Sequence, residues 1–141
     1  MAKKVRVLLA DDHATVRNAL AAILQARKGI EVAGQATDGL EAVEQSRTLR
    51  PDGVVMDVAM PKLNGIEATR RIRAELPGVQ VIGFSAQQQE HWAAALRKAG
   101  AVACLGKDAP LEELIAVIRA CRSRRDKSPE VTPKRAPKIV P

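Results

Sequence analysis

The chain has 141 residues, of which 46% are apolar and 28% are charged, a composition typical of one soluble globular domain. No apolar run approaches the roughly 18 residues that span a bilayer. The run near the N-terminus is too short for a signal peptide, so we expect a cytoplasmic protein without a membrane segment. The net charge is +7, but residues 123–141 hold six basic side chains against two acidic ones. Most of the positive charge therefore lies in this last segment.

Short apolar segments alternate with amphipathic ones along the rest of the chain. The apolar segments predict five buried strands, at 5–10, 31–36, 52–57, 79–85 and 101–106. Apolar residues recur at helical spacing after each strand, and the first helix is expected at about 14–27. Strands that are apolar on both faces and alternate with helices indicate a parallel sheet covered on both sides. The sequence therefore predicts an α/β fold, a doubly wound five-stranded parallel sheet of (βα)5 order.

Composition divides the chain into a domain at 1–122 and a tail at 123–141. The tail has four prolines, clustered charge and no helical spacing, which predicts a basic, proline-rich, disordered segment. The two cysteines, Cys104 and Cys121, lack the spacing of a metal site. We expect them to be reduced and partly buried.

Polar side chains follow four of the five predicted strands, and they are Asp11, Asp12, Asp57, Ser85 and Lys107. The carboxyl ends of parallel strands meet at one edge of the sheet, where open α/β sheets bind ligands. Each residue also has a structural alternative. An aspartate or serine can cap the next helix, and the lysine can be solvated or pair with a neighbouring acid. All five at the same edge favour a binding or catalytic site.

Clustered carboxylates repel one another, so such a set usually holds a divalent cation. Oxygen ligands without cysteine or a histidine pair favour Mg²⁺. A carboxylate beside the metal can act as a nucleophile toward a phosphoryl group, and Asp57 suits this role because it stands alone on the central strand. Ser85 and Lys107 can take the remaining phosphoryl oxygens. We assign His13 to the helix start or the surface rather than to the metal.

Four motifs, in this order and spacing, resemble the receiver domain of bacterial two-component response regulators over about residues 4 to 122. The motifs are LLADDH (8–13), VVMDVAMPKLNG (54–65), VIGFSA (81–86) and LGKDAP (105–110). The resemblance implies the CheY-like, flavodoxin-like version of the predicted fold. The stretches around the first and last motifs look most like the NarL/FixJ-type subgroup, whose members usually continue into a DNA-binding helix-turn-helix.

The resemblance implies a phosphoacceptor and a metal site. Asp57 would accept the phosphoryl group. Asp11, Asp12 and Asp57 would hold Mg²⁺ together with the backbone carbonyl of Ala59. A sensor histidine kinase or a phosphotransfer protein would supply the phosphoryl group. The chain would not be an enzyme beyond catalysing its own phosphorylation and dephosphorylation.

The resemblance also implies a switch. Lys107 would contact the phosphoryl group, and Ser85 would move toward it and rearrange the surface of the fourth helix, fifth strand and fifth helix. Pro61 and Gly65 are expected to shape the loop after the phosphoacceptor, because proline fixes φ and glycine permits turn geometry closed to other residues.

Cys104 departs from the family pattern. Three residues before the lysine, family members commonly have an aromatic side chain that swings inward on activation, and a small thiol cannot replace that ring. Trp92, expected on the fourth helix near the same face, could take over a contact role. Its alternative role is to cover an alanine-rich core.

Three outputs are compatible with the sequence. The leading interpretation is a stand-alone receiver that contacts an unknown downstream protein, with homodimerisation on phosphorylation left open. The second is a truncated NarL/LuxR-type transcriptional regulator whose basic tail contacts DNA weakly and in a salt-sensitive manner. The third, a Mg²⁺-dependent phosphohydrolase, is disfavoured because such enzymes typically need a second aspartate where this chain has Ala59.

Overall fold

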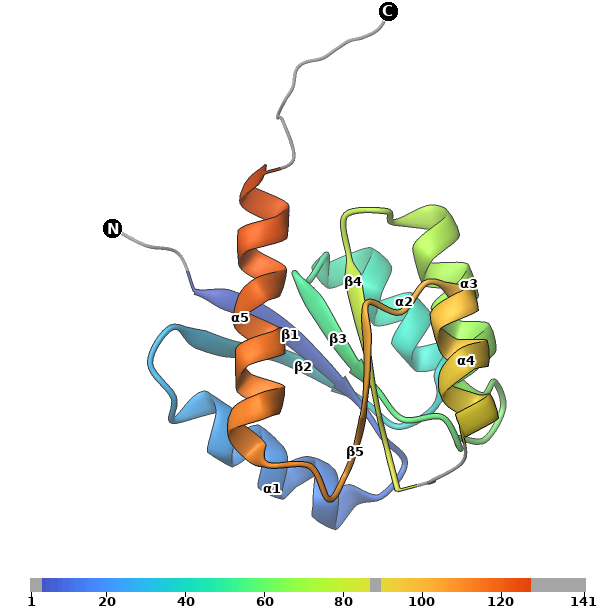
Figure 1. The fold of residues 1–141 in the computed structure, drawn as a ribbon, viewed down its shortest axis with the longest axis horizontal. Helices are drawn as coiled ribbons and strands as arrows, with labels where there is room; N and C mark the ends of the chain where they lie inside the picture. Colours follow the sequence, from blue (N-terminus) through green and yellow to red (C-terminus); the bar gives the residue numbers. More distant parts are fainter. Residues whose placement is uncertain (1–3, 87–89, 128–141) are drawn as a thin grey trace, which may run out of the picture.

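The computed structural model describes residues 4–86 and 90–127, and for 90–91 and 122–127 it describes the backbone alone. Within these residues five strands alternate with five helices (Figure 1). The strands are β1 (Val5–Ala10), β2 (Ile30–Ala36), β3 (Gly53–Met56), β4 (Gln80–Ser85) and β5 (Ala103–Gly106). The helices are α1 (Ala14–Gln25), α2 (Gly39–Leu49), α3 (Gly65–Glu75), α4 (Glu90–Ala99) and α5 (Leu111–Lys127). The predicted (βα)5 order is confirmed.

The five strands form one parallel sheet in the order β2-β1-β3-β4-β5. The chain starts inside the sheet at β1, moves outward to β2, and then crosses back to β3 and on to β5. The strand order therefore reverses between β1 and β3. Ligands of open α/β sheets bind beyond the carboxyl ends of the strands at such a switch point.

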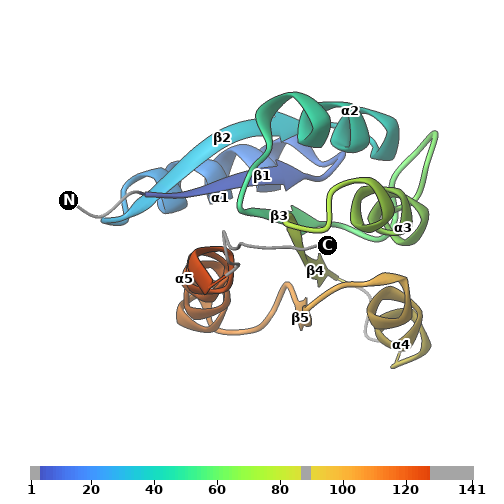
Figure 2. The same cartoon turned by 90° about the horizontal axis from the view of Figure 1, so that it is seen from above.

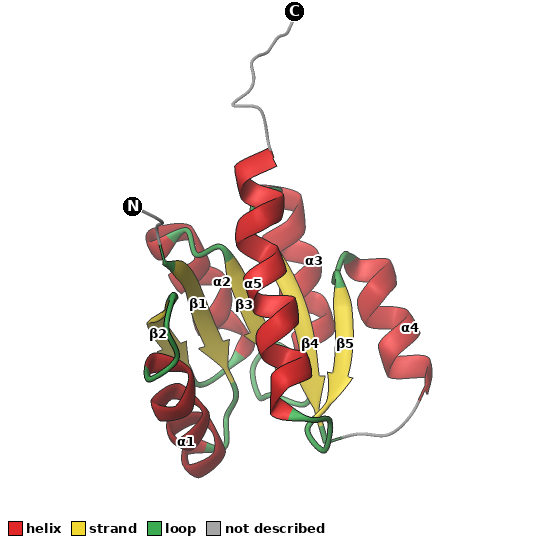
Figure 3. Cartoon of the chain, turned by 60° about the vertical axis from the view of Figure 1, so that its left-hand side comes forward, coloured by secondary structure: helices red, strands yellow, loops and turns green. Residues whose placement is uncertain are grey.

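Helices cover both faces of the sheet. Helices α1 and α5 lie on one face, and α2, α3 and α4 lie on the other (Figures 2 and 3). Neighbouring strand residues point to opposite faces, so Leu8 and Val54 pack toward α2 and α3, whereas Leu9 and Val55 pack toward α1 and α5. Both faces bury apolar side chains, which explains why the strands read as continuous apolar runs.

Strand β2 contains a β-bulge that the sequence did not predict. Val7 pairs with Val32, but the next residue, Leu8, pairs with Gly34, so Ala33 is the extra residue. The residues after the bulge therefore point to the opposite face of the sheet from the one that they would face in a regular strand.

Helix α5 continues to Lys127, five residues into the segment predicted to be a tail. The rest of that segment, 128–141, lies outside the described residues. The helix runs away from the carboxyl ends of the strands (Figure 1). No helix among the described residues is both long enough and apolar enough to cross a bilayer.

Candidate functional site

The two neighbouring central strands bring Asp11 and Asp57 to the switch point. The backbone hydrogen bonds of the sheet continue past the strand ends. The Asp11 N–H donates to the Ala36 carbonyl, and the Asp57 N–H donates to the Ala10 carbonyl, each over 3.0 Å. Both carboxylates are buried, with exposed fractions of 7% and 4%. The sheet backbone thus fixes two buried acids side by side.

A lysine and a serine approach these acids from β4 and the end of β5. Lys107 Nζ lies 2.6 Å from Asp11 Oδ2 and 3.8 Å from Asp57 Oδ2. Ser85 is buried, and its hydroxyl donates to the Asp57 carboxylate. The Lys107 N–H also donates to the Ser85 carbonyl over 2.9 Å. The ammonium, the hydroxyl and both carboxylates therefore form one connected group.

The two buried carboxyls have pKa values displaced in opposite directions. Burial, followed by the charge of Asp11, raises the pKa of Asp57 above its usual value, although Lys107 partly offsets the effect. Burial opposes ionisation of Asp11 too, but hydrogen bonds from Lys107 and the His13 backbone outweigh it and lower the pKa of Asp11. Asp11 is therefore the stable anion, and Asp57 is the acid whose charge is poorly compensated.

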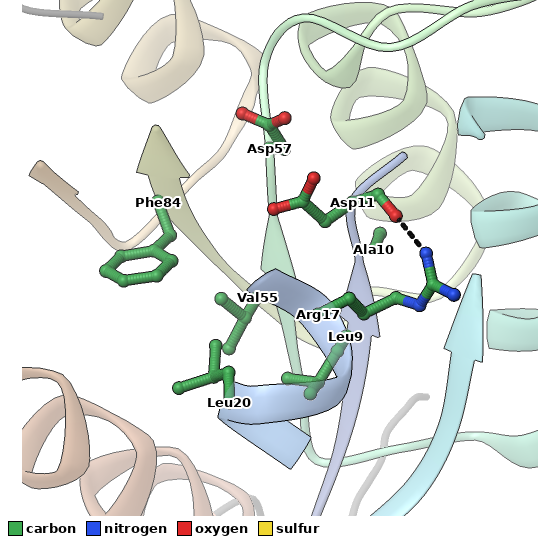
Figure 4. Close-up of a pocket in the computed structure, with 8 residues that line it drawn as sticks. All are labelled: Leu9, Ala10, Asp11, Arg17, Leu20, Val55, Asp57 and Phe84. Atoms are coloured by element: carbon green, nitrogen blue, oxygen red, sulfur yellow. Dashed lines mark hydrogen bonds between the residues drawn. The ribbon is translucent and has the colours of Figure 1, made fainter. Parts of the chain in front are cut away.

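An apolar floor accounts for the burial of Asp57. A cavity of about 10 Å³ lies below the carboxylates, and Leu9, Leu20, Val55 and Phe84 are among its lining residues (Figure 4). These side chains exclude water from one side of the site. Cations and dipoles must therefore compensate the negative charge from the other side.

The third acid, Asp12, is exposed and lies next to His13. His13 Nδ1 is 3.1 Å from Asp11 Oδ1 and 3.2 Å from Asp12 Oδ1. His13 is also the N-cap residue of α1 and makes no side-chain cap bond. The structural alternative for the acids, capping of α1, is therefore wrong. His13 starts the helix as expected, and its ring also faces both carboxylates.

The donor atoms at this edge fit a hard divalent cation. One ligand atom from each of Asp11, Asp12, His13 and Asp57 can be chosen so that all lie within 4.8 Å of one another. Three of these donors are carboxylate oxygens, and Mg²⁺ prefers oxygen ligands while keeping several waters. The exposed Asp12 leaves the solvent side open for those waters. The residues present therefore suit the predicted Mg²⁺ site.

The loop between β3 and α3 approaches Asp57 very closely. A Cβ on Gly65 would lie 2.0 Å from the Asp57 carbonyl oxygen, and the Gly65 N–H donates to the Val58 carbonyl over 2.8 Å. Gly65 does not have a positive φ; the residue of this loop that does is Lys62, at 68°. The expectation that Gly65 supplies special turn geometry is therefore wrong, and close packing explains it instead. Ala59 lies exposed in the same loop.

Small residues of β4 and β5 lie beneath α4. Gly83 pairs with Cys104, and a Cβ on Gly83 would lie 2.1 Å from Leu96 Cδ2. Cys104 Sγ lies 3.6 Å from the Ala93 carbonyl, so the thiol contacts the helix backbone itself. Trp92 is 8% exposed and lies in the core, which agrees with the alternative role of covering the core. Helix α4 therefore packs directly against the small residues Gly83 and Cys104.

The fold class and the acidic edge together define a CheY-like domain, and solved structures share this arrangement. A two-component response regulator of the LuxR family from Aurantimonas superposes with a TM-score of 0.81 and 31% identity. The match covers 97% of this chain and 91% of that one. The family model described as the response regulator receiver domain matches residues 7–119. The chain belongs to this family, the receiver domains of two-component response regulators.

Curated relatives place the chain near the NarL/FixJ-type regulators. The response regulator GacA of Pseudomonas viridiflava is 37% identical over 115 residues, which cover 82% of this chain and 54% of GacA. The response regulator UvrY of Escherichia coli is 39% identical over 119 residues, which cover 84% of this chain and 55% of UvrY. The chain thus spans about half the length of these relatives.

Sequence reasoning missed one contact of this site. Arg17 of α1 donates from Nη1 to the Asp11 carbonyl over 2.7 Å (Figure 4). Its position, one helical turn after His13, brings it back toward the start of the helix. That spacing could have identified Arg17 from the sequence. Its second partner, Gln35 of β2, faces α1 because of the bulge, which the sequence did not predict.

Proposed function

We propose that this chain is a phosphoacceptor response regulator and that Asp57 accepts the phosphoryl group. One observation carries the proposal: Asp57 is a buried carboxylate at the switch point, hydrogen-bonded by Ser85 and 3.8 Å from Lys107. A carboxylate oxygen that no cation contacts closely keeps a lone pair available to attack phosphorus, and Lys107 and Ser85 lie near enough to bind the transferred oxygens.

The proposed reaction transfers the phosphoryl group from a phosphohistidine. An Asp57 oxygen attacks phosphorus, the new O–P bond forms as the N–P bond breaks, and the imidazole leaves with the electron pair. The acyl phosphate then carries a charge of about −2. Lys107 can pair with its oxygens, and the Ser85 hydroxyl can donate to another of them.

Asp11, Asp12 and Asp57 would hold Mg²⁺, with the backbone carbonyl of Ala59 as a further ligand. When bound, the ion would neutralise part of the negative charge that the phosphoryl group brings to these acids. The closeness of these acids supports the assignment, because ligand atoms of Asp11, Asp12 and Asp57 can be chosen within 4.8 Å of one another.

A protein donor fits the surface beside the site. Two large apolar residues of α1, Val16 and Ile23, are 41% and 43% exposed. A groove of about 420 Å³ between α1 and α5 opens next to Lys107. Exposed apolar surface at the entrance to a reactive group is typical of a docking face, here for a histidine kinase or a phosphotransfer protein.

The proposed output is a change of the α4–β5–α5 surface, read by another protein or by a second copy of the chain. Ser85 ends β4, so a pull on its hydroxyl acts directly on the strand that carries α4. Weak DNA contact through the tail is the alternative output. We place the domain at 1–122, the basic tail at 123–141 with α5 continuing through its first five residues, and the protein in the cytoplasm.

Radiolabelled acetyl phosphate tests the acceptor. With Mg²⁺ the wild-type chain should acquire label that hydroxylamine releases, as expected of an acyl phosphate, and Asp57→Asn should acquire none. Chelation of Mg²⁺ should abolish labelling of the wild type. The measurement is the radioactivity retained on the intact chain.

Asp108→Asn is the matched control, because it removes one carboxylate from the exposed loop directly after Lys107. It should be labelled like the wild type. Labelling of Asp57→Asn at the wild-type level, or label that resists hydroxylamine, would rule out Asp57 as the acceptor.

A further inference from the structure

Arg17 joins α1 to two other elements at the acidic edge. The side chain is half-buried. Its Nη1 donates to the Asp11 carbonyl over 2.7 Å, and its Nε donates to Gln35 Oε1 over 2.8 Å. The guanidinium therefore links α1 to the end of β2. It also contacts the backbone between the adjacent acids Asp11 and Asp12.

The carbonyl that Arg17 holds belongs to the peptide linking Asp11 to Asp12. The Asp11 N–H is held separately by the Ala36 carbonyl over 3.0 Å. With both sides of Asp11 fixed, the direction in which the chain leaves toward Asp12 is fixed too. Two of the three carboxylates that we assign to Mg²⁺, those of Asp11 and Asp12, belong to this short segment.

The bulge in β2 explains why Gln35 can reach Arg17. In a regular strand residues 32 and 35 would face opposite sides of the sheet. Because Ala33 is inserted, Val32 packs in the core cluster of α1 and α5, and Gln35 also faces α1. A second contact steadies the strand end, since Gln45 Nε2 of α2 donates to the Gln35 carbonyl over 2.7 Å.

We propose that Arg17, held by Gln35, is a positioning residue that sets the geometry of Asp11 and Asp12 for the divalent cation. The inference rests on the proposed function, because that function places Mg²⁺ at these acids. Residues that orient metal ligands without touching the metal commonly change metal affinity by about 10- to 100-fold when they are lost.

A positioning role and a purely electrostatic role predict opposite results. Arg17 carries a positive charge near the site, so its removal would strengthen Mg²⁺ binding if charge alone mattered. If Arg17 orients the ligands, its removal weakens binding although a repulsive charge is gone. The sign of the change therefore distinguishes the two roles.

Calorimetric titration of the full chain with Mg²⁺ measures this sign. Arg17→Met should raise the Mg²⁺ dissociation constant about 10-fold. Arg17→Lys keeps the charge and one hydrogen bond, and should fall between Arg17→Met and the wild type. In labelling by acetyl phosphate, the half-saturating Mg²⁺ concentration of Arg17→Met should rise by a similar factor while the rate at saturating Mg²⁺ stays near the wild-type rate.

Arg27→Met is the matched control. Arg27 also makes two hydrogen bonds, both to Glu112, and follows Arg17 by ten residues, roughly 15 Å along the helix direction. Its loss should change the dissociation constant by less than about two-fold, because the charge is distant and screened.

An Arg17→Met chain that binds Mg²⁺ as tightly as the wild type, or more tightly, would overturn the inference. Failure of the wild-type chain to bind Mg²⁺ would instead overturn the proposed function. If Arg17→Met does not fold, as judged by circular dichroism, Gln35→Leu replaces it, since it keeps the charge and removes one anchor. Gln35→Leu should bind Mg²⁺ more weakly than the wild type, and unchanged binding would equally overturn the inference.

Discussion

Asp57 and Asp11 are neighbouring buried acids that differ in how closely Lys107 approaches them. Lys107 lies 2.6 Å from Asp11 and 3.8 Å from Asp57, so the stronger compensation goes to the residue that we do not assign as acceptor. Burial raises the pKa of Asp57, and a carboxyl whose pKa is raised by folding destabilises the folded state once it ionises. The acceptor is therefore a destabilising residue in the absence of Mg²⁺.

Asp57→Asn should stabilise the chain when Mg²⁺ is chelated. The unfolded carboxyl ionises near its ordinary pKa of 3.8, and the folded one ionises at higher pH. The wild type therefore loses stability as pH rises from the unfolded pKa through the folded pKa, and asparagine avoids this loss. At neutral pH we expect a gain of roughly 1 kcal/mol in the free energy of unfolding, the common size of a single-substitution effect.

Thermal unfolding at several pH values measures this gain. It should shrink toward acidic pH, where the wild-type carboxyl is neutral in both states. A gain that does not change with pH, or a loss of stability at neutral pH, would contradict the charge-based explanation.

At the scale of elements, the sequence predicted the strand and helix order because buried parallel strands are apolar on both faces. It also placed Asp11, Asp57, Ser85 and Lys107 at one edge, since parallel strands end on the same side. It could not predict the bulge at Ala33, because Ala33 and Gly34 are both small and fit either register. The hydrogen bond between Arg17 and Gln35 depends on that bulge, so the sequence could not predict this contact either.

The β3–α3 loop offers a test at the same scale. Gly65→Ala places a Cβ against the Asp57 carbonyl, so we expect a loss of about 1–3 kcal/mol in the free energy of unfolding, in the range of overpacked sites. Because the clash displaces Asp57 itself, labelling by acetyl phosphate should slow as well. Urea unfolding and labelling rates measure the two effects.

Gly78→Ala is the control, since a Cβ there meets nothing within 4 Å. It should change stability by less than about 0.5 kcal/mol and leave labelling unaffected. Equal effects of the two substitutions would show that close approach at Gly65 does not matter.

At the scale of the whole molecule, the acidic edge and α4 are linked through β4. Ser85 ends this strand at Asp57, and Gly83, two residues earlier, lies under Leu96 of α4. The missing side chain of Gly83 and the small side chain of Cys104 let the helix lie close to the sheet. Movement of Ser85 would therefore act on the closely packed helix α4. It would not act through an aromatic side chain at position 104, where this chain has a cysteine.

Trp92 can report this movement, because it is the sole tryptophan of the chain and is 8% exposed. Adding acetyl phosphate and Mg²⁺ should change the fluorescence emission of the wild type and should not change that of Asp57→Asn. Emission that stays constant while label accumulates on the wild type would contradict a rearrangement of α4 at this residue.

The hydrogen bond from Gly65 to Val58 has a consequence for the chemical ageing of the protein. The chain contains one Asn-Gly pair, Asn64–Gly65, and in flexible peptides such pairs deamidate readily when the glycine nitrogen attacks the asparagine side chain. Here that nitrogen is held by the Val58 carbonyl, and the Asn64 side-chain oxygen accepts the Glu67 N–H over 2.9 Å. Folding thus protects an asparagine whose conversion would add a carboxylate to the loop that follows Asp57.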